Sequence, residues 1–142
     1  MRVTPITLVL VIATAGAVRA QDTTATPVMQ GPSLSVEAVL TRMVLDRMPQ
    51  DTVTALPTPA ATDSLYLWTR VTGAEPGMGT VLHHVWFRGD EQVADVELNV
   101  GGSPWRTWSM KTIPAEWTGA WRVEVRDAAG NVLQTVQFTV GQ

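Results

Sequence analysis

The strongest constraint on the fold of this chain is the alternation of apolar and polar residues in short segments separated by turn residues. Residues 93–100 show it most clearly, because four aliphatic residues share one parity and three polar residues share the other. Successive side chains of a β-strand point to opposite faces, so a period of two predicts a strand with one buried face. Strand character recurs in residues 65–73, 80–89, 105–111, 120–127 and 132–140.

Turn residues join these segments at intervals typical of a β-sandwich. Gly89 and Asp90 predict a hairpin, and the stretch "DAAGN" at 127–131 predicts a second one near the carboxyl end. No segment with a helical period separates the later strands, which argues against a parallel α/β sheet. The sequence therefore predicts an all-β fold, an immunoglobulin-like antiparallel β-sandwich of roughly seven strands. We assign it to a single domain, residues 34–142.

The segments before residue 65 have less regular patterns. Residues 35–45 fit either a strand or a short helix, because their apolar residues fall on both parities. Residues 48–64 are rich in proline and threonine and lack periodic apolar positions, which predicts a long surface loop. Residues 21–33 are polar and rich in turn residues, as in a flexible lead-in.

The amino-terminal residues have the pattern of a secretory signal peptide. Arg2 precedes an apolar run at 6–18, and Val18 and Ala20 occupy the positions that a signal peptidase reads. The run is shorter than the roughly 20 apolar residues that span a bilayer. We therefore expect residues 1–20 to be cleaved, leaving a periplasmic or secreted protein with no integral membrane segment.

Charge and cysteine content narrow the function classes. Removing Arg2 and Arg19 with the signal leaves eight basic residues against 13 acidic ones, a net charge of −5. Such a balance argues against nucleic-acid binding. The sequence contains no cysteine, so packing must stabilise the domain without disulfides, and no thiolate can act as nucleophile or metal ligand.

The six tryptophans supply much of the apolar surface that such a domain can bury. Trp105 and Trp108 are separated by an odd number of residues, so an extended chain places them on opposite faces. Trp121 shares its parity with aliphatic neighbours and is predicted to be buried. We expect Trp86, Trp108 and Trp121 in the core, with Trp117 covering one end of the sandwich.

The remaining aromatic residues define a candidate ligand-binding surface. Tyr66, Trp68 and Trp105 are expected on outward faces, close to Arg70 and Arg106. Exposed rings beside guanidinium groups can stack on sugars. They can equally form arginine–tryptophan stacks that cover a sheet and bind nothing.

The histidines are the main candidates for catalysis. His83 and His84 are neighbours on a predicted strand and face opposite ways, so they cannot jointly hold a metal ion. We expect His84 to be a buried, hydrogen-bonded core residue. The alternative is a hydrolase that uses His84 with a nearby carboxylate. Because no nucleophile motif or phosphate-binding loop is present, we predict no catalytic residue, cofactor or metal site.

Three stretches carry a resemblance to a known family: "HVWFRG" at 84–89, "WRTWSMK" at 105–111 and "WTGAWRVEVRDAAGNVL" at 117–133. They resemble the bacterial domain of unknown function family 2914 in residues and spacing, over about residues 65–140. Met110 departs from the family pattern, in which a second serine is commoner. The resemblance implies a small β-rich domain, often carried by exported or envelope proteins, and implies no activity.

These observations together predict a non-catalytic binding or interaction module of the bacterial cell envelope. Its partner is predicted to be an envelope protein or a glycan, and the sequence leaves the choice open. A glycan platform needs at least two coplanar exposed rings, whereas a protein contact needs an apolar patch or an open sheet edge. The poorly charged strand at 132–140 is a candidate for such an edge.

Overall fold

The computed structural model describes residues 33–57 and 62–141, and all regular structure within them is β-strand. The predicted signal peptide 1–20 and nearly all of the lead-in 21–33 lie outside the described residues. Seven strands are seven or more residues long: β1 (Ser35–Thr41), β5 (Thr62–Thr72), β6 (Thr80–Arg88), β7 (Glu91–Val100), β8 (Trp105–Pro114), β9 (Gly119–Asp127) and β10 (Val132–Val140). Three have two residues each: β2 (Val44–Leu45), β3 (Met48–Pro49) and β4 (Ala55–Leu56). The described part of the chain contains no helix able to cross a membrane.

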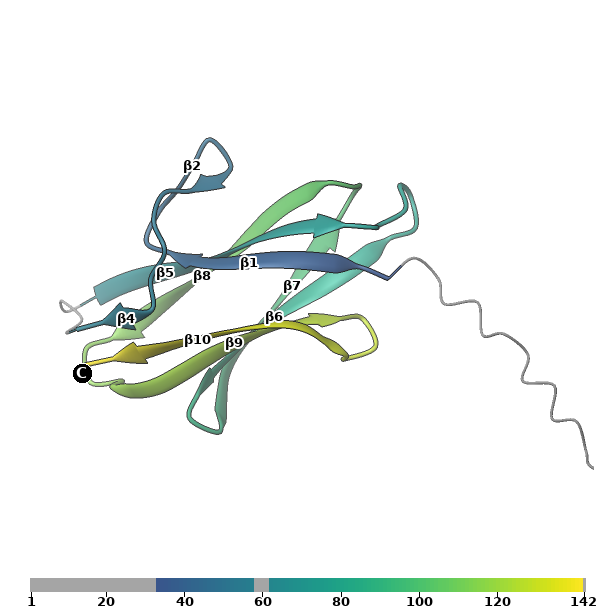
Figure 1. The fold of residues 1–142 in the computed structure, drawn as a ribbon. Coiled ribbons are helices and arrows are strands. Elements are labelled where there is room, and N and C mark those ends of the chain that lie inside the picture. Colours follow the sequence, from purple (N-terminus) through teal and green to yellow (C-terminus); the bar gives the residue numbers. More distant parts are fainter. Residues whose placement is uncertain (1–32, 58–61, 142) are drawn as a thin grey trace, which may run out of the picture.

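The long strands form two sheets that face each other (Figure 1). One sheet has the order β1-β5-β8, and the other has the order β4-β10-β9-β6-β7. The pairs β6–β7 and β9–β10 are antiparallel hairpins, while β5–β6, β7–β8 and β8–β9 connect the two sheets. Three long strands packed on four is the arrangement of an immunoglobulin-like sandwich. The predicted fold class is therefore confirmed.

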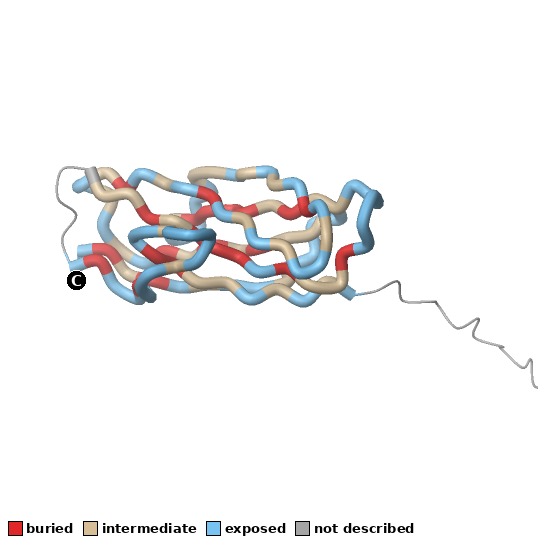
Figure 2. Tube along the Cα trace, turned by 90° about the horizontal axis from the view of Figure 1, so that it is seen from above, coloured by how far each residue is buried: buried red, intermediate tan, exposed pale blue. Residues whose placement is uncertain are grey.

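The core lies between the sheets and is filled mainly by the inward side chains of the long strands. Figure 2 marks the buried positions along the chain. Trp86, Trp121 and Phe138 form its aromatic centre. The Trp121 ring stacks on Phe138 with centroids 5.6 Å apart, and Trp86 meets Phe138 edge-on at 6.5 Å. Each enclosed aromatic side chain removes on the order of 150–250 Å² from water, which stabilises this cysteine-free domain. The predicted burial of Trp86 and Trp121 is confirmed.

The less regular segments contain more strands than their sequences indicate. Residues 35–41 are a strand rather than a helix, because β1 pairs with β5 along its whole length. The stretch 48–64 is not an unstructured connection: it contains β3 and β4, and β5 already begins at Thr62. Pairing with distant strands decides these elements, since β4 bonds to the end of β10.

Candidate functional site

A chain of polar side chains crosses the core between the two sheets. His84 on β6 is fully buried, and its Nδ1 lies 2.8 Å from Ser109 Oγ on β8. Its Nε2 lies 3.4 Å from Thr69 Oγ1 on β5. The indole nitrogen of Trp86 donates to Ser109 Oγ over 3.3 Å, and Thr69 Oγ1 donates to the carbonyl of Thr107 over 2.9 Å. These bonds join β6 to both β5 and β8.

The bond directions fix the tautomer of His84. Thr69 has one hydroxyl hydrogen and donates it to a carbonyl, so it can only accept from His84 Nε2–H. Ser109 accepts the Trp86 hydrogen and donates its own to His84 Nδ1. Each member of the chain is thus satisfied with a neutral imidazole, whereas a protonated imidazole would leave the hydroxyl hydrogen of Ser109 without its acceptor.

Burial lowers the pKa of His84 to about 3, because the dry core disfavours the charged ring. The predicted core position of His84 is confirmed. The carboxylate that the alternative hydrolase requires does not lie beside His84: the ring bonds to two hydroxyls, and Ser109 is itself 5% exposed. Although Ser109 and His84 are within the distance of a nucleophile–base pair, both are buried, and the lowered pKa makes the imidazole a weak base.

The histidine that does contact a carboxylate is His83, for which the sequence did not predict this contact. Its Nδ1 lies 2.8 Å from Asp95 Oδ1 on the outer face of the larger sheet. The pair borders an open hollow of about 270 Å³ whose other walls include Arg126 and Asp127, and the lining contains no hydroxyl or thiol. In residues 33–57 and 62–141 no three His, Asp or Glu side chains are grouped to hold a metal ion.

The predicted ligand-binding residues do not form one surface. Tyr66, Trp68 and Arg70 lie on the outer face of the three-stranded sheet, as does Arg106 on β8. Trp105 lies on the inner face, where it is half-buried and packs against the core. The prediction that Trp105 points outward is wrong.

Strand pairing explains the reversed orientation of β8. Trp105 pairs with Val71, a core residue, whereas Trp108 pairs with Trp68 on the outer face. Residues opposite each other in a ladder share a face, so β5 dictates which indole of β8 points inward. Trp108 is consequently 36% exposed, and its predicted place in the core is also wrong. The prediction that the two indoles face opposite ways is confirmed.

Trp68 lies on the outer face but is only 2% exposed, so its predicted exposure is wrong. A hairpin formed by residues 42–50, here called the flap, extends over this side of the sheet (Figure 1). The carbonyl of Arg47 at its tip accepts the Trp68 indole hydrogen over 2.9 Å. The flap thus removes from solvent one of the rings on which the glycan hypothesis depended.

Arg47 anchors the flap to β8. Its guanidinium donates to the carbonyl of Arg106 over 3.1 Å and lies 5.9 Å from the Trp105 ring. Asp46 and Arg47 have φ angles of 52° and 63°, in the left-handed region that disfavours residues other than glycine. Because such a conformation costs on the order of 1 kcal/mol per residue, the tip depends on these contacts.

The base of the flap is closed by Asp51. Its carboxylate accepts hydrogen bonds from the Thr41 hydroxyl and from the backbone N–H of Arg42. The Thr41 bond is the main cause that lowers the pKa of Asp51, assisted by the Arg42 backbone bond and charge. Within the flap, the side chain of Gln50 donates to the carbonyls of Leu45 and Met48.

The upper side of the flap is apolar. Leu45 and Met48 are paired across the hairpin and therefore share a face, and Met43 lies on the same face two residues earlier. These three are 55%, 43% and 56% exposed. Trp108 and Met110 on β8 are exposed as well, so five of the seven exposed large apolar residues of the described chain lie on this side. We call the flap together with the outer sides of β5 and β8 the flap-side face.

The flap-side face is also basic. It carries Arg42, Arg47, Arg70 and Arg106, which are four of the eight basic residues that follow residue 20. None of the four forms an ion pair with any residue that the structure describes. The face thus combines exposed apolar side chains with guanidinium groups that form no ion pair, although Glu37 lies opposite Arg70 and the charge of Arg42 acts on Asp51.

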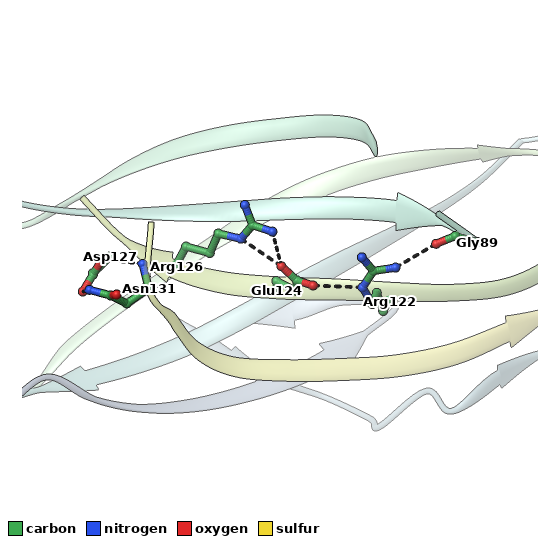
Figure 3. A network of polar contacts seen from close by, with 6 residues as sticks. All are labelled: Gly89, Arg122, Glu124, Arg126, Asp127 and Asn131. Carbon is green, nitrogen blue, oxygen red and sulfur yellow. Dashed lines mark hydrogen bonds and ion pairs between the residues drawn. The ribbon is translucent and has the colours of Figure 1, made fainter. Parts of the chain in front are cut away.

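On the outer face of the larger sheet, by contrast, a network of polar contacts joins the charged side chains of β9 (Figure 3). Glu124 accepts hydrogen bonds from both Arg122 and Arg126, and Arg122 also donates to the carbonyl of Gly89. The Arg122 guanidinium lies 3.9 Å from the centroid of Phe87, which the two arginines cover. Partial burial acts to raise the pKa of Glu124, but the hydrogen bonds and charges of the arginines outweigh it and lower the pKa. The charges of Arg122, Glu124 and Arg126 are therefore paired with one another.

The fold and the buried network define the class of the protein: an immunoglobulin-like β-sandwich domain with a hydrogen-bonded core histidine. Residues 79–140 match the family described as "Protein of unknown function (DUF2914)", which confirms the resemblance seen in the sequence, although the match begins later than residue 65. Three residues of the quoted motifs, His84, Trp86 and Ser109, belong to the buried network. Their role in this chain is therefore to join the sheets.

Structural similarity extends to several immunoglobulin-like domains. An immunoglobulin-like protein from Pseudomonas aeruginosa has 13% identity and a TM-score of 0.47, over 78% of this chain and 98% of that one. A CARDB domain from Pyrococcus furiosus, crystallised with di-metal ions, has 11% identity and a TM-score of 0.44, covering 77% and 93% of the two chains. Its solution structure gives 8% identity and a TM-score of 0.45, covering 77% and 97%. No curated protein matches the sequence.

Proposed function

We propose that this protein is an exported, non-catalytic interaction module of the bacterial cell envelope, and that it binds a protein partner through the flap-side face. One observation carries the proposal: five exposed large apolar side chains share this side with four arginines that form no ion pair with any described residue. Export rests on the signal-like sequence at 1–20.

The chemistry of the face favours an acidic and partly apolar protein surface. Contiguous apolar side chains rimmed by polar ones mark interaction sites on soluble domains. Methionine is flexible and polarizable, which suits it to contacts that adapt to a partner. The arginines give this side a basic character in a chain of acidic net charge, so electrostatic attraction would orient an acidic partner toward it.

The glycan alternative has less support. It depended on a platform of exposed rings at Tyr66, Trp68 and Trp105. Trp68 is covered by the flap and Trp105 lies on the inner face, which leaves Tyr66 and Trp108 as the aromatic rings on this side. These two belong to different rows of the β5–β8 ladder and are not a directly opposed pair.

Site-specific photocrosslinking in the native envelope tests the proposal. A photoreactive phenylalanine analogue at Met110, which is 54% exposed, should give a discrete protein adduct. The same analogue at Asn99, exposed on the outer side of β7, is the matched control and should give none. A paired substitution of Arg70 and Arg106 by glutamate should weaken the Met110 adduct. Equal adducts at both positions, or none at Met110, would contradict the proposal.

A further inference from the structure

The edge strand β10 differs from the other long edge strands in its charge. β1 carries Glu37, β7 carries Glu91, Asp95 and Glu97, and β8 carries Arg106 and Lys111. Charged residues on an edge oppose pairing with another chain. Residues 132–140 contain no charged residue, and their exposed side chains include Gln134, Thr135 and Gln137. β10 therefore lacks the charged side chains that protect the other long edges.

Much of the outer edge of β10 has no hydrogen-bonded strand, although β1 of the other sheet lies alongside it. On that side β4 pairs with it in parallel at Thr139 and Val140 alone. Among the strands that the structure describes, none pairs with residues 132–138 on this side. Residues 132–138 span roughly 23 Å at 3.3 Å per residue, and every second residue of this stretch directs its backbone N–H and C=O to the outer edge.

We infer that the open edge of β10 binds a second copy of this chain, so that two sandwiches form a continuous sheet across a two-fold axis. A two-fold axis places identical residues opposite each other, which brings like charges together on a charged edge. Two-fold pairing through β7 would bring the acidic residues of one copy near the same residues of the second copy. On β10 it brings no like charges together, and the glutamine and threonine side chains can hydrogen-bond across the axis.

The register of the open stretch fits such an axis at Thr135, its central residue. In the β9–β10 ladder, Thr135 pairs with Glu124 on the outer face. A bulge near Leu133 shifts the register by one residue, so Val132 lies opposite Arg126 and is also on the outer face. With the bulge included, an antiparallel copy centred on Thr135 places Val132 opposite Gln137 of the second copy.

This register brings an exposed apolar side chain to a hollow. Val132 is 51% exposed. Gln137 borders an open groove of about 410 Å³, whose walls also include Arg122, Phe138 and Thr139. Self-pairing of β10 therefore places Val132 of each copy against the groove beside Gln137 of the other copy. The contact forms twice in the dimer.

The absence of cysteine allows a direct test. Opposed Cα atoms of an antiparallel pair lie about 4.5–5.5 Å apart, within the range that a disulfide bridges. Under mild oxidation, purified Thr135→Cys protein should form a disulfide-linked dimer much faster than Asn99→Cys, whose cysteine lies on the exposed side of β7. Circular dichroism of both variants confirms that they are folded.

Sedimentation equilibrium provides the second measurement. The wild-type protein should dimerise with rising concentration, and Thr135→Lys should raise the dimer dissociation constant at least about fivefold, since like charges then face each other. Asn99→Lys should leave it unchanged. Mixing Thr135→Lys with Thr135→Glu should restore the dimer. A wild-type monomer at all concentrations, or equal crosslinking at positions 99 and 135, would overturn the inference and leave the proposed partner site on the other sheet unaffected.

Discussion

Acidification from pH 7 to pH 5 should destabilise the folded protein, because His84 stays neutral in the core but takes up a proton when the chain unfolds. The pKa of His84 is lowered to about 3 in the folded state from an ordinary value of 6.5. Between these two values the unfolded chain binds more protons than the folded chain, so stability falls as pH decreases. The loss begins near pH 6.5 and continues until the folded imidazole itself becomes protonated.

The magnitude follows from the same two values. Each tenfold rise in proton concentration below pH 6.5 removes about 1.4 kcal/mol while the folded ring stays neutral. At pH 5 the expected loss in the free energy of unfolding is therefore about 2 kcal/mol relative to pH 7. Protonation of His84 would also remove the acceptor of the Ser109 hydroxyl hydrogen, which acts in the same direction.

Urea unfolding followed by tryptophan fluorescence at pH 7, 6 and 5 measures this dependence. His84→Gln should lower stability at every pH but remove most of its dependence on pH in this range. His83→Gln is the matched control, since His83 is partly exposed and bonds to Asp95. It should keep the steep dependence of the wild type. Equal wild-type stability at pH 7 and pH 5, or an unchanged slope in His84→Gln, would refute the reasoning.

Two further substitutions probe the surfaces. Trp68→Phe removes the indole donor to the Arg47 carbonyl, which should loosen the flap and lower the free energy of unfolding by about 1 kcal/mol. Tryptic cleavage after Arg47 should become faster in Trp68→Phe and stay unchanged in Trp108→Phe. Unchanged cleavage in Trp68→Phe would show that the bond does not hold the flap. Glu124→Gln removes the carboxylate between Arg122 and Arg126 and should lower the thermal midpoint at pH 7. The difference from wild type should be smaller in acid, because a carboxylate whose pKa is lowered by folding stabilises the fold only at pH values above that pKa. A difference that grows in acid would contradict this account.

The fold was predictable where a strand has one clearly apolar face. β7 and β9 have such faces, and their observed burial follows the alternation in the sequence. His84 was also predictable, because it shares its parity with Leu82 and Trp86. The hairpin partners of β7 and β9 are β6 and β10, which lie nearby in the sequence, so local signals were enough to predict these strands.

The orientation of β8 was not predictable in the same way. It carries a tryptophan on each face, so apolar content alone does not identify the inner one, and pairing with β5 decides it. The flap was missed for a related reason: β2 and β3 are two residues long, and the turn lacks the usual glycine. Its one visible signal was the apolar residues of 43–48 beside Arg42 and Arg47, and their exposure depends on the anchoring of the flap over Trp68.

The central claim, that the flap-side face is where a partner binds, can be tested by hydroxyl-radical footprinting of the methionines. Met43, Met48 and Met110 lie on this face, while Met78 is 71% exposed in the segment between β5 and β6 and serves as an internal control. We expect oxidation of the first three to fall in native envelope relative to the purified protein, with Met78 unchanged. Uniform oxidation of all four in both preparations, or protection of Met78 alone, would contradict the account.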